Sequence, residues 1–136
     1  MFNHRQFLKV AGMVAGVLFA WPIRWVKAKP LGLKLDKVEK LKNVGRWAIL
    51  KIKIKKKPVL FIRTSEDTIR ALDPTCPHKK CQVQYNEKIN QIVCPCHKSR
   101  FNPDGKYLDG PAKKDLTAYK AYLRKNMIVI DLDKDH

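Results

Sequence analysis

The sequence predicts an all-β protein: a small antiparallel β sandwich or barrel that carries a loop-rich subdomain and follows one N-terminal transmembrane helix. Three observations support this prediction. Most of the 136-residue chain alternates short apolar runs with polar turns, which is typical of short antiparallel strands. One stretch, about 73–114, has the composition of loops and contains all four cysteines. The first 29 residues contain a long apolar run.

The N-terminal segment, residues 1–29, is predicted to be a signal-anchor. The 20 residues 7–26 are mostly apolar, and about 20 such residues cross a bilayer. Trp21 and Trp25 lie near one end of this run, where indole rings favour the membrane interface. A cleaved secretory signal is the alternative, but the lysine within residues 26–28 makes a poor cleavage site.

The start of the chain resembles a twin-arginine export signal. It reads NHRQFLK, with basic residues followed by Phe7, Leu8 and Lys9, although His4 stands where the first arginine belongs. Export by a twin-arginine-like route is therefore one option. We expect one anchor in a bacterial cytoplasmic membrane and a globular domain, residues 30–136, on its outer, periplasmic side.

Six runs in this domain predict strands. Residues 50–55, LKIKIK, alternate apolar and basic side chains, which indicates a half-buried strand. Polar turns separate this run from the other predicted strands, which are residues 59–64, 68–73, 88–94, 120–125 and 127–132, with Asn126 at the last turn. Residues 27–35 are expected to form a linker. The body of the chain shows no ten-residue amphipathic pattern and no internal repeat.

The chain carries a formal net charge of +17. Residues 1–29 contain five basic residues and no acidic one, so most of the excess belongs to the domain. Such a charge suggests an anionic partner, which could be nucleic acid, anionic lipid or an acidic protein. A solvated, lysine-rich surface without a specific partner is the plainer interpretation.

The cysteines and internal histidines form two short clusters, CPHKKC at 76–81 and CPCHKS at 94–99. The second cluster is not a c-type haem site, because one residue rather than two separates its cysteines. Sulfur and imidazole donors at close spacing suit zinc or an iron–sulfur cluster. A zinc-stabilised nucleic-acid-binding module fits poorly with this spacing and with an export segment, so no nucleic-acid partner is expected. Two plain disulfides would explain the cysteines but not the matched histidines.

The two clusters resemble the pattern of Rieske iron–sulfur proteins, C-x-H-x-x-C … C-x-C-H-x-S, in the disulfide-containing form of cytochrome bc and bf complexes. This resemblance implies one [2Fe-2S] cluster, with Cys76 and Cys94 on one iron and His78 and His97 on the other. It also implies solvent-facing histidines that couple electron transfer to proton release. A Cys81–Cys96 disulfide would pin the two loops together and would fit an oxidising, exported location.

Further positions match the family or depart from it. Ser99 matches a serine whose hydroxyl hydrogen-bonds a bridging sulfide, and Gly110-Pro111-Ala112 resembles the proline loop that covers the cluster. Phe101 stands where many relatives have tyrosine, so we expect a lower potential, as would suit menaquinol. Lysines also replace residues that flank the histidines in the quinol-linked members, and they should raise the potential and lower the histidine pKa values. These lysines are Lys79, Lys80 and Lys98.

The resemblance implies an electron-transfer subunit of a membrane oxidoreductase rather than a catalyst alone. It would accept electrons from quinol beside a cytochrome b-type membrane subunit and pass them to a c-type cytochrome. A sister interpretation is the Rieske small subunit of an arsenite-oxidase-type molybdenum enzyme. A soluble ferredoxin for an oxygenase is disfavoured, because such ferredoxins usually lack the disulfide cysteines and an anchor.

Overall fold

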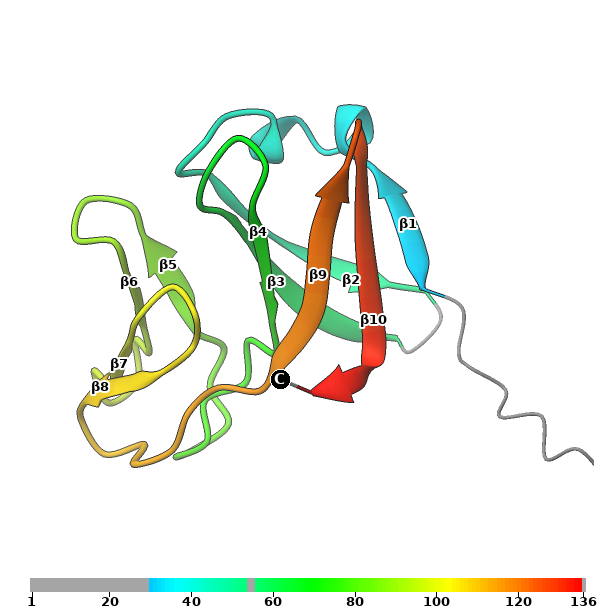
Figure 1. Ribbon diagram of the computed structural model, residues 1–136. Coiled ribbons are helices and arrows are strands. Elements are labelled where there is room, and N and C mark those ends of the chain that lie inside the picture. The colour runs from blue at the N-terminus through cyan, green and yellow to red at the C-terminus, as the bar shows by residue number, and fades with distance from the viewer. Residues whose placement is uncertain (1–29, 54–55, 136) are drawn as a thin grey trace, which may run out of the picture.

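The computed structural model describes residues 30–53 and 56–135, which form two antiparallel sheets (Figure 1). The larger sheet has six strands in the order β1-β10-β9-β4-β3-β2. Its strands are β1 (Leu31–Lys34), β2 (Trp47–Ile52), β3 (Lys57–Arg63), β4 (Ile69–Leu72), β9 (Ala118–Arg124) and β10 (Met127–Asp135). Two short 3-10 helices, η2 (Leu35–Lys37) and η3 (Glu39–Leu41), follow β1. All pairings within the sheet are antiparallel.

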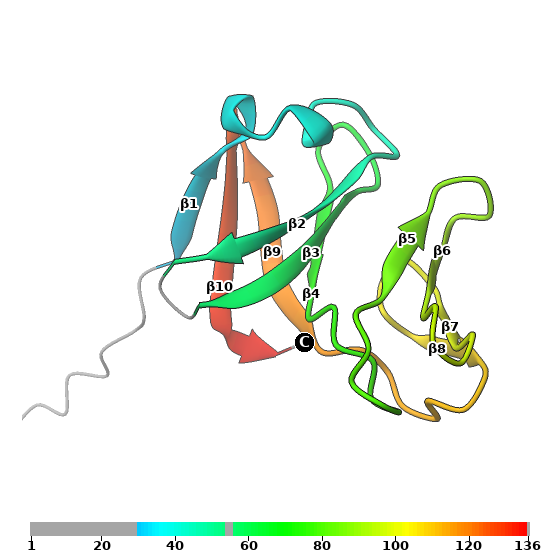
Figure 2. The same cartoon turned by 180° about the vertical axis from the view of Figure 1, so that it is seen from behind.

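The smaller sheet is inserted between β4 and β9 and has four strands in the order β5-β6-β7-β8. Its strands are β5 (Gln84–Asn86), β6 (Gln91–Val93), β7 (Arg100–Phe101) and β8 (Tyr107–Asp109). Seen from both sides, this sheet and its loops stand beside the larger sheet (Figure 2). They lie within the stretch 73–114 that is rich in loop-forming residues.

Strand β3 lies between two hydrophobic cores because it is buried on both faces. Its alternating side chains point in opposite directions, so Leu60 and Ile62 enter the core shared with the smaller sheet. Val59 and Phe61 enter the second core, which the curled larger sheet encloses with Ile128 and Ile130 of β10. We call these the inner core and the outer core. The inner core is the one that reaches Cys76 and Cys94.

The predicted all-β antiparallel architecture is confirmed, with shifted strand ends. The first predicted strand begins earlier and ends earlier, as Trp47–Ile52, because Lys53 already belongs to the turn before β3. The run 88–94 shortens to Gln91–Val93, because Lys88–Asn90 form the turn of the β5–β6 hairpin. The predicted turn at Asn126 is confirmed between β9 and β10.

The expected linker at 27–35 is wrong for its described part. Leu31–Lys34 is strand β1, which pairs with β10 from Leu31 opposite Ile130 to Lys34 opposite Met127. Leu31 and Leu33 pack against the outer core, so a four-residue alternation is enough to extend the sheet once β10 supplies the pairing edge. The sequence alone does not reveal that edge.

The predicted membrane helix falls within residues 1–29, outside the described residues. Among residues 30–53 and 56–135, no helix is long and apolar enough to cross a membrane.

A matched pair of substitutions tests the two-core architecture. Ile62 of the inner core and Ile128 of the outer core are both 0% exposed. We expect Ile62→Ala and Ile128→Ala each to lower the free energy of unfolding by about 2–5 kcal/mol, because each leaves a cavity. Only Ile62→Ala should also speed proteolysis of the 74–83 loop, measured under native conditions by limited digestion and mass spectrometry. Equal loop cleavage in both variants would contradict separate cores.

Candidate metal centre

Two loops project from the same end of the smaller sheet and carry the predicted donor residues. The first loop precedes β5, and the second connects β6 to β7. In the first loop, the Cys76 amide donates to the carbonyl of Cys81 at 2.8 Å, and the Lys80 amide donates to the carbonyl of Cys76 at 2.9 Å. Lys80 has φ of 58°, the left-handed conformation that lets the chain turn back.

The second loop repeats this backbone arrangement. The Cys94 amide donates to the carbonyl of Ser99 at 2.8 Å, and the Lys98 amide donates to the carbonyl of Cys94 at 2.9 Å. Lys98 has φ of 59°, so a left-handed lysine stands four residues after the cysteine in both loops. The two loops therefore hold their cysteines in the same backbone conformation. Equal spacing in the sequence does not by itself guarantee this match.

The first cysteine of each loop points into the inner core. Cys76 is 0% exposed and Cys94 is 1% exposed, and neither forms a disulfide. Burial raises the pKa of the Cys76 thiol, and the hydrogen-bonded Cys94 thiol beside it raises that pKa further. A buried thiol pair of this kind favours a cationic metal centre that stabilises both thiolates.

The two histidines lie together at the outer side of the cysteines. Their rings meet edge to face with centroids 4.6 Å apart. His78 is half-buried and His97 is exposed. Partial burial lowers the pKa of His78 below its usual value, and the neighbouring His97 and Lys79 lower it further. The contribution of Lys79 to the pKa of His78 has the direction expected for a flanking lysine, although burial is the larger cause.

A disulfide joins the outer parts of the loops. Cys81 and Cys96 are bonded at 2.05 Å, with their Cα atoms 6.4 Å apart. The expected pairing is thus confirmed, and it leaves Cys76 and Cys94 as the free thiols.

A third segment, Gly110–Ala112, covers the second loop. The Ala112 amide donates to the Ser99 hydroxyl at 3.0 Å, and Ser99 is fully buried. The Tyr107 hydroxyl donates to the carbonyl of Gly110, and Pro111 is half-buried. Tyr107 is a site residue that the sequence pattern did not predict, although an aromatic residue three positions before a Gly-Pro pair was an available signal.

Phe101 forms part of the wall behind the cysteines. It lies on β7, is 0% exposed and belongs to the same core as Cys76 and Cys94. Its ring meets that of Tyr107 edge to face, with centroids 6.4 Å apart.

The residues present fit a two-iron cluster. The Nδ1 atom of His78 is buried and has no hydrogen-bond partner, a state shared among the described residues only with Gln91 Oε1. A buried unpaired nitrogen is costly unless something binds it. Within the described ranges, no three His, Cys, Asp or Glu side chains gather so that one metal ion could join them. Two thiols below two imidazoles instead match a centre with two metal atoms.

The comparisons with known proteins address the same segment. The family model for the Rieske [2Fe-2S] domain matches residues 33–120. The chain belongs to this family. Membership implies one [2Fe-2S] cluster for the Rieske domain, in agreement with the donor set.

Curated relatives of the Rieske domain include iron-sulfur subunits of cytochrome b6-f complexes. The cytochrome b6-f complex iron-sulfur subunit of Chlorobaculum tepidum is 32% identical over 65 residues, covering 48% of this chain and 36% of that protein. The cytochrome b6-f complex iron-sulfur subunit 1 of Nostoc sp. is 31% identical over 90 residues, covering 65% and 50%. The chain thus spans half or less of the length of these curated relatives.

Solved structures confirm the fold. The plasma membrane Rieske protein PetC3 of the cyanobacterium Synechocystis PCC 6803 has a TM-score of 0.59 and 30% identity, covering 76% of this chain and 99% of that chain. A hyperthermophilic respiratory Complex III chain has a TM-score of 0.56 over 83% of this chain and 82% of that chain, at 22% identity. This second likeness supports the fold alone.

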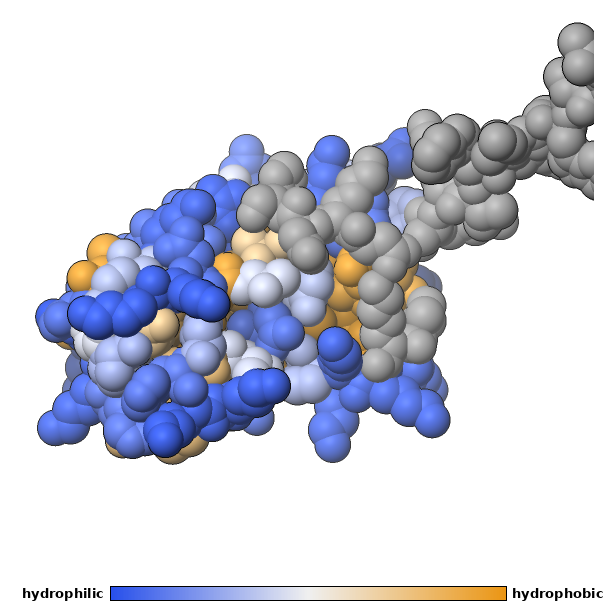
Figure 3. Space-filling model, turned by 90° about the horizontal axis from the view of Figure 1, so that it is seen from below, coloured by the Kyte–Doolittle hydropathy of each residue, from blue (hydrophilic) through white to orange (hydrophobic). Residues whose placement is uncertain are grey.

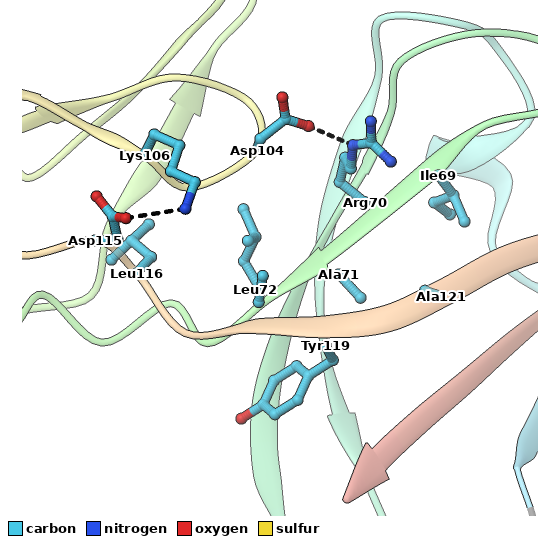
Figure 4. Close-up of a pocket in the computed structure, with 11 residues that line it drawn as sticks. Ile69, Arg70, Ala71, Leu72, Asp104, Lys106, Asp115, Leu116, Tyr119 and Ala121 are labelled. Atoms are coloured by element: carbon cyan, nitrogen blue, oxygen red, sulfur yellow. Dashed lines mark hydrogen bonds and ion pairs between the residues drawn. The ribbon is translucent and has the colours of Figure 1, made fainter. Parts of the chain in front are cut away.

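A cavity of about 350 Å³ lies away from the cluster site, between β4, β9 and the loops of the smaller sheet (Figure 4). Two ion pairs line it, Arg70 with Asp104 and Lys106 with Asp115. The first pair joins β4 to the β7–β8 loop. None of the candidate ligands lines this cavity.

Gly110 offers a test of the covering segment. A Cβ atom there would lie 2.5 Å from the Ser99 Cα, and the residue has φ of +99°. Gly45 has a similar φ of +82° but nothing within 4 Å of its Cβ position. We expect Gly45→Ala to lower the free energy of unfolding by about 1 kcal/mol, for the left-handed conformation alone. Gly110→Ala should cost about 1–3 kcal/mol more, because its methyl group displaces the covering segment.

Chemical denaturation of the two variants measures this difference. Equal losses for Gly110→Ala and Gly45→Ala would show that the covering segment does not pack tightly on Ser99.

Proposed function

We propose that this chain is the electron-transfer subunit of a membrane complex of the cytochrome bc or b6-f type. The bound cluster would supply reversible one-electron transfer. Cys76 and Cys94 would hold the inner iron, and His78 and His97 would hold the outer iron. The observation that carries this proposal is the exposed histidine edge above two fully buried thiols.

The arrangement of the histidines supports proton-coupled electron transfer. Because His78 Nδ1 is the buried nitrogen, its Nε2 is the atom left to hold a proton at the surface. The exposed ring of His97 would likewise keep its outer nitrogen available. A quinol hydroxyl is the kind of donor that could hydrogen-bond such a nitrogen and release its proton there.

The buried shell would tune the potential. The Ser99 hydroxyl accepts the Ala112 amide, and its own proton has no acceptor among the hydrogen bonds of the described residues, so it is free for a cluster sulfide. Phe101 cannot donate such a bond. Hydrogen bonds to sulfur stabilise the more negative, reduced state. The balance favours a potential below that of tyrosine-bearing relatives and therefore a low-potential quinol such as menaquinol.

The relatives support the partner assignment. Subunits of cytochrome b6-f complexes share 31–32% identity with this chain over the matched region. By analogy, a cytochrome b-type subunit, a quinol and a c-type cytochrome would be the partners. Residues 1–29 would anchor the domain at the outer face of a bacterial cytoplasmic membrane.

One observation favours a second candidate, the small subunit of an arsenite-oxidase-type molybdenum enzyme. Three exposed lysines flank the histidines, and an apolar quinol pocket would have to desolvate them without partners. A polar protein interface would not. Copurification from native membranes would distinguish the two candidates by the partner that is recovered.

Electron paramagnetic resonance of the ascorbate-reduced protein tests the proposed function, with iron and zinc assayed in parallel. A rhombic signal with an average g below the free-electron value, and two irons per chain, is the expected result. The same signal appearing only with dithionite would indicate a lower potential. Stoichiometric zinc without iron or signal would rule out electron transfer.

Phe101→Tyr tests the tuning of the potential. The new hydroxyl would lie in the core that contains both cysteines, so it could donate to a cluster sulfur. A hydrogen bond to a charged group contributes about 1.5 kcal/mol, which corresponds to a rise of about 60 mV for a one-electron couple. Redox titration followed by visible circular dichroism measures the change. Phe101→Leu is the control, and an unchanged potential in the tyrosine variant would contradict the assignment.

A further inference from the structure

The carboxylates of residues 74–114 are already paired. Residues 74–114 contain eight basic and three acidic residues. Each of the three acidic residues forms an ion pair with an arginine. The pairs are Glu87 with Arg46, Asp104 with Arg70, and Asp109 with Arg100. The negative charge of this segment is therefore largely neutralised within the protein.

Three lysines beside the histidines have no such partner. Lys79 and Lys80 follow His78 directly, and Lys98 follows His97. All three are exposed, and none forms an ion pair within residues 30–53 and 56–135. We call Lys79, Lys80 and Lys98 the lysine rim. The end of the molecule that bears these loops is largely hydrophilic when seen from below (Figure 3).

The loop backbone fixes where the rim lies. The amides of Lys80 and Lys98 are bonded to the carbonyls of Cys76 and Cys94, so both lysines are anchored to the site. Both adopt a left-handed conformation, which costs a lysine about 1 kcal/mol relative to glycine. The backbone conformation therefore does not favour lysine at either position. The positive charge of the side chain is the remaining reason for lysine there.

The exposed histidine edge is where an electron has the shortest path to the surface, since both cysteines are buried. A partner that approaches this edge must cover the rim. An apolar partner face would remove water from the ammonium groups and offer no hydrogen-bond acceptors in its place. Carboxylates on the partner would instead pair with them and accelerate association.

We propose that the lysine rim binds an acidic face of a protein redox partner and draws that face onto the edge formed by His78 and His97. This inference rests on the proposed electron-transfer function and specifies the chemistry of its partner.

Two triple variants separate the rim from the net charge of the chain. The rim variant is Lys79→Gln, Lys80→Asn and Lys98→Asn. The control variant is Lys120→Gln, Lys56→Asn and Lys125→Asn, on the larger sheet. Lys56 and Lys125 have φ of 53° and 54°, so the two Lys→Asn changes of each variant fall in the same left-handed conformation, which asparagine tolerates. Each variant removes three positive charges.

The first measurement uses the full chain with its cluster, reduced and then mixed with an oxidant in stopped flow. Ferricyanide, a trianion, takes one electron and becomes ferrocyanide. Cobalt(III) tris(phenanthroline), a trication, takes one electron and becomes the cobalt(II) complex. For the wild type, raising the ionic strength from about 10 mM to about 500 mM should slow ferricyanide and speed the cobalt complex. At low salt the rim variant should react with ferricyanide about tenfold more slowly than the control variant.

The second measurement does not depend on electron transfer. Fluorescein-labelled hexaglutamate serves as the probe of an acidic face, and its binding is followed by fluorescence anisotropy at low salt. The rim variant should bind it about tenfold more weakly than the control variant, because three adjacent charges are lost from one site.

The outcomes distinguish the two proposals. If neither oxidant reacts and no cluster signal is present, the proposed function fails. If the cluster signal is normal but rim and control variants behave alike in both measurements, the function stands and the lysine rim is no docking surface.

Discussion

The rest of the site depends on one constraint: two backbone loops of the same design must hold Cys76 and Cys94 side by side in a dry core. In each loop, both the amide and the carbonyl of the cysteine form hydrogen bonds within the loop. These backbone bonds alone fix the direction of the side chain, so each thiol points inward. The Cys81–Cys96 disulfide then joins the loops outside the core. With their relative position fixed, the histidines can remain at the surface and still meet.

Strand β3 of the larger sheet helps to hold the two cysteines in place. A strand buried on both faces lets one core close the curled sheet while the other supports the loops. Leu60 and Ile62 pack beneath the cysteines, while Phe61 stabilises the far side. The Arg70–Asp104 pair adds a polar tie between the sheets. The thiols therefore face a core that the larger sheet helps to form.

The sequence predicted the long strands well, because Leu50–Ile52 alternates apolar and basic side chains and Met127–Leu132 is rich in β-forming apolar residues. It missed β1 and, in the smaller sheet, β5, β7 and β8, whose pairing comes from the tertiary fold and not from local propensity. The resemblance of the two Cys/His clusters to the Rieske pattern predicted the Cys81–Cys96 disulfide. The left-handed conformations of Lys80 and Lys98 could not be predicted from the sequence, because lysine rarely adopts a positive φ.

Two opposing influences act on the potential of such a site, and their positions decide which dominates. The lysine rim is exposed, and charges in water are largely screened beyond about 8 Å at physiological salt. Phe101 is 0% exposed and belongs to the same core as both cysteines, so the hydrogen bond that it cannot donate is lost in a medium of low dielectric, where it would have been strong. The missing buried donor should therefore outweigh the added surface charges. On this argument the lysines would act mainly on the encounter with a partner, and Phe101 would act mainly on the redox potential.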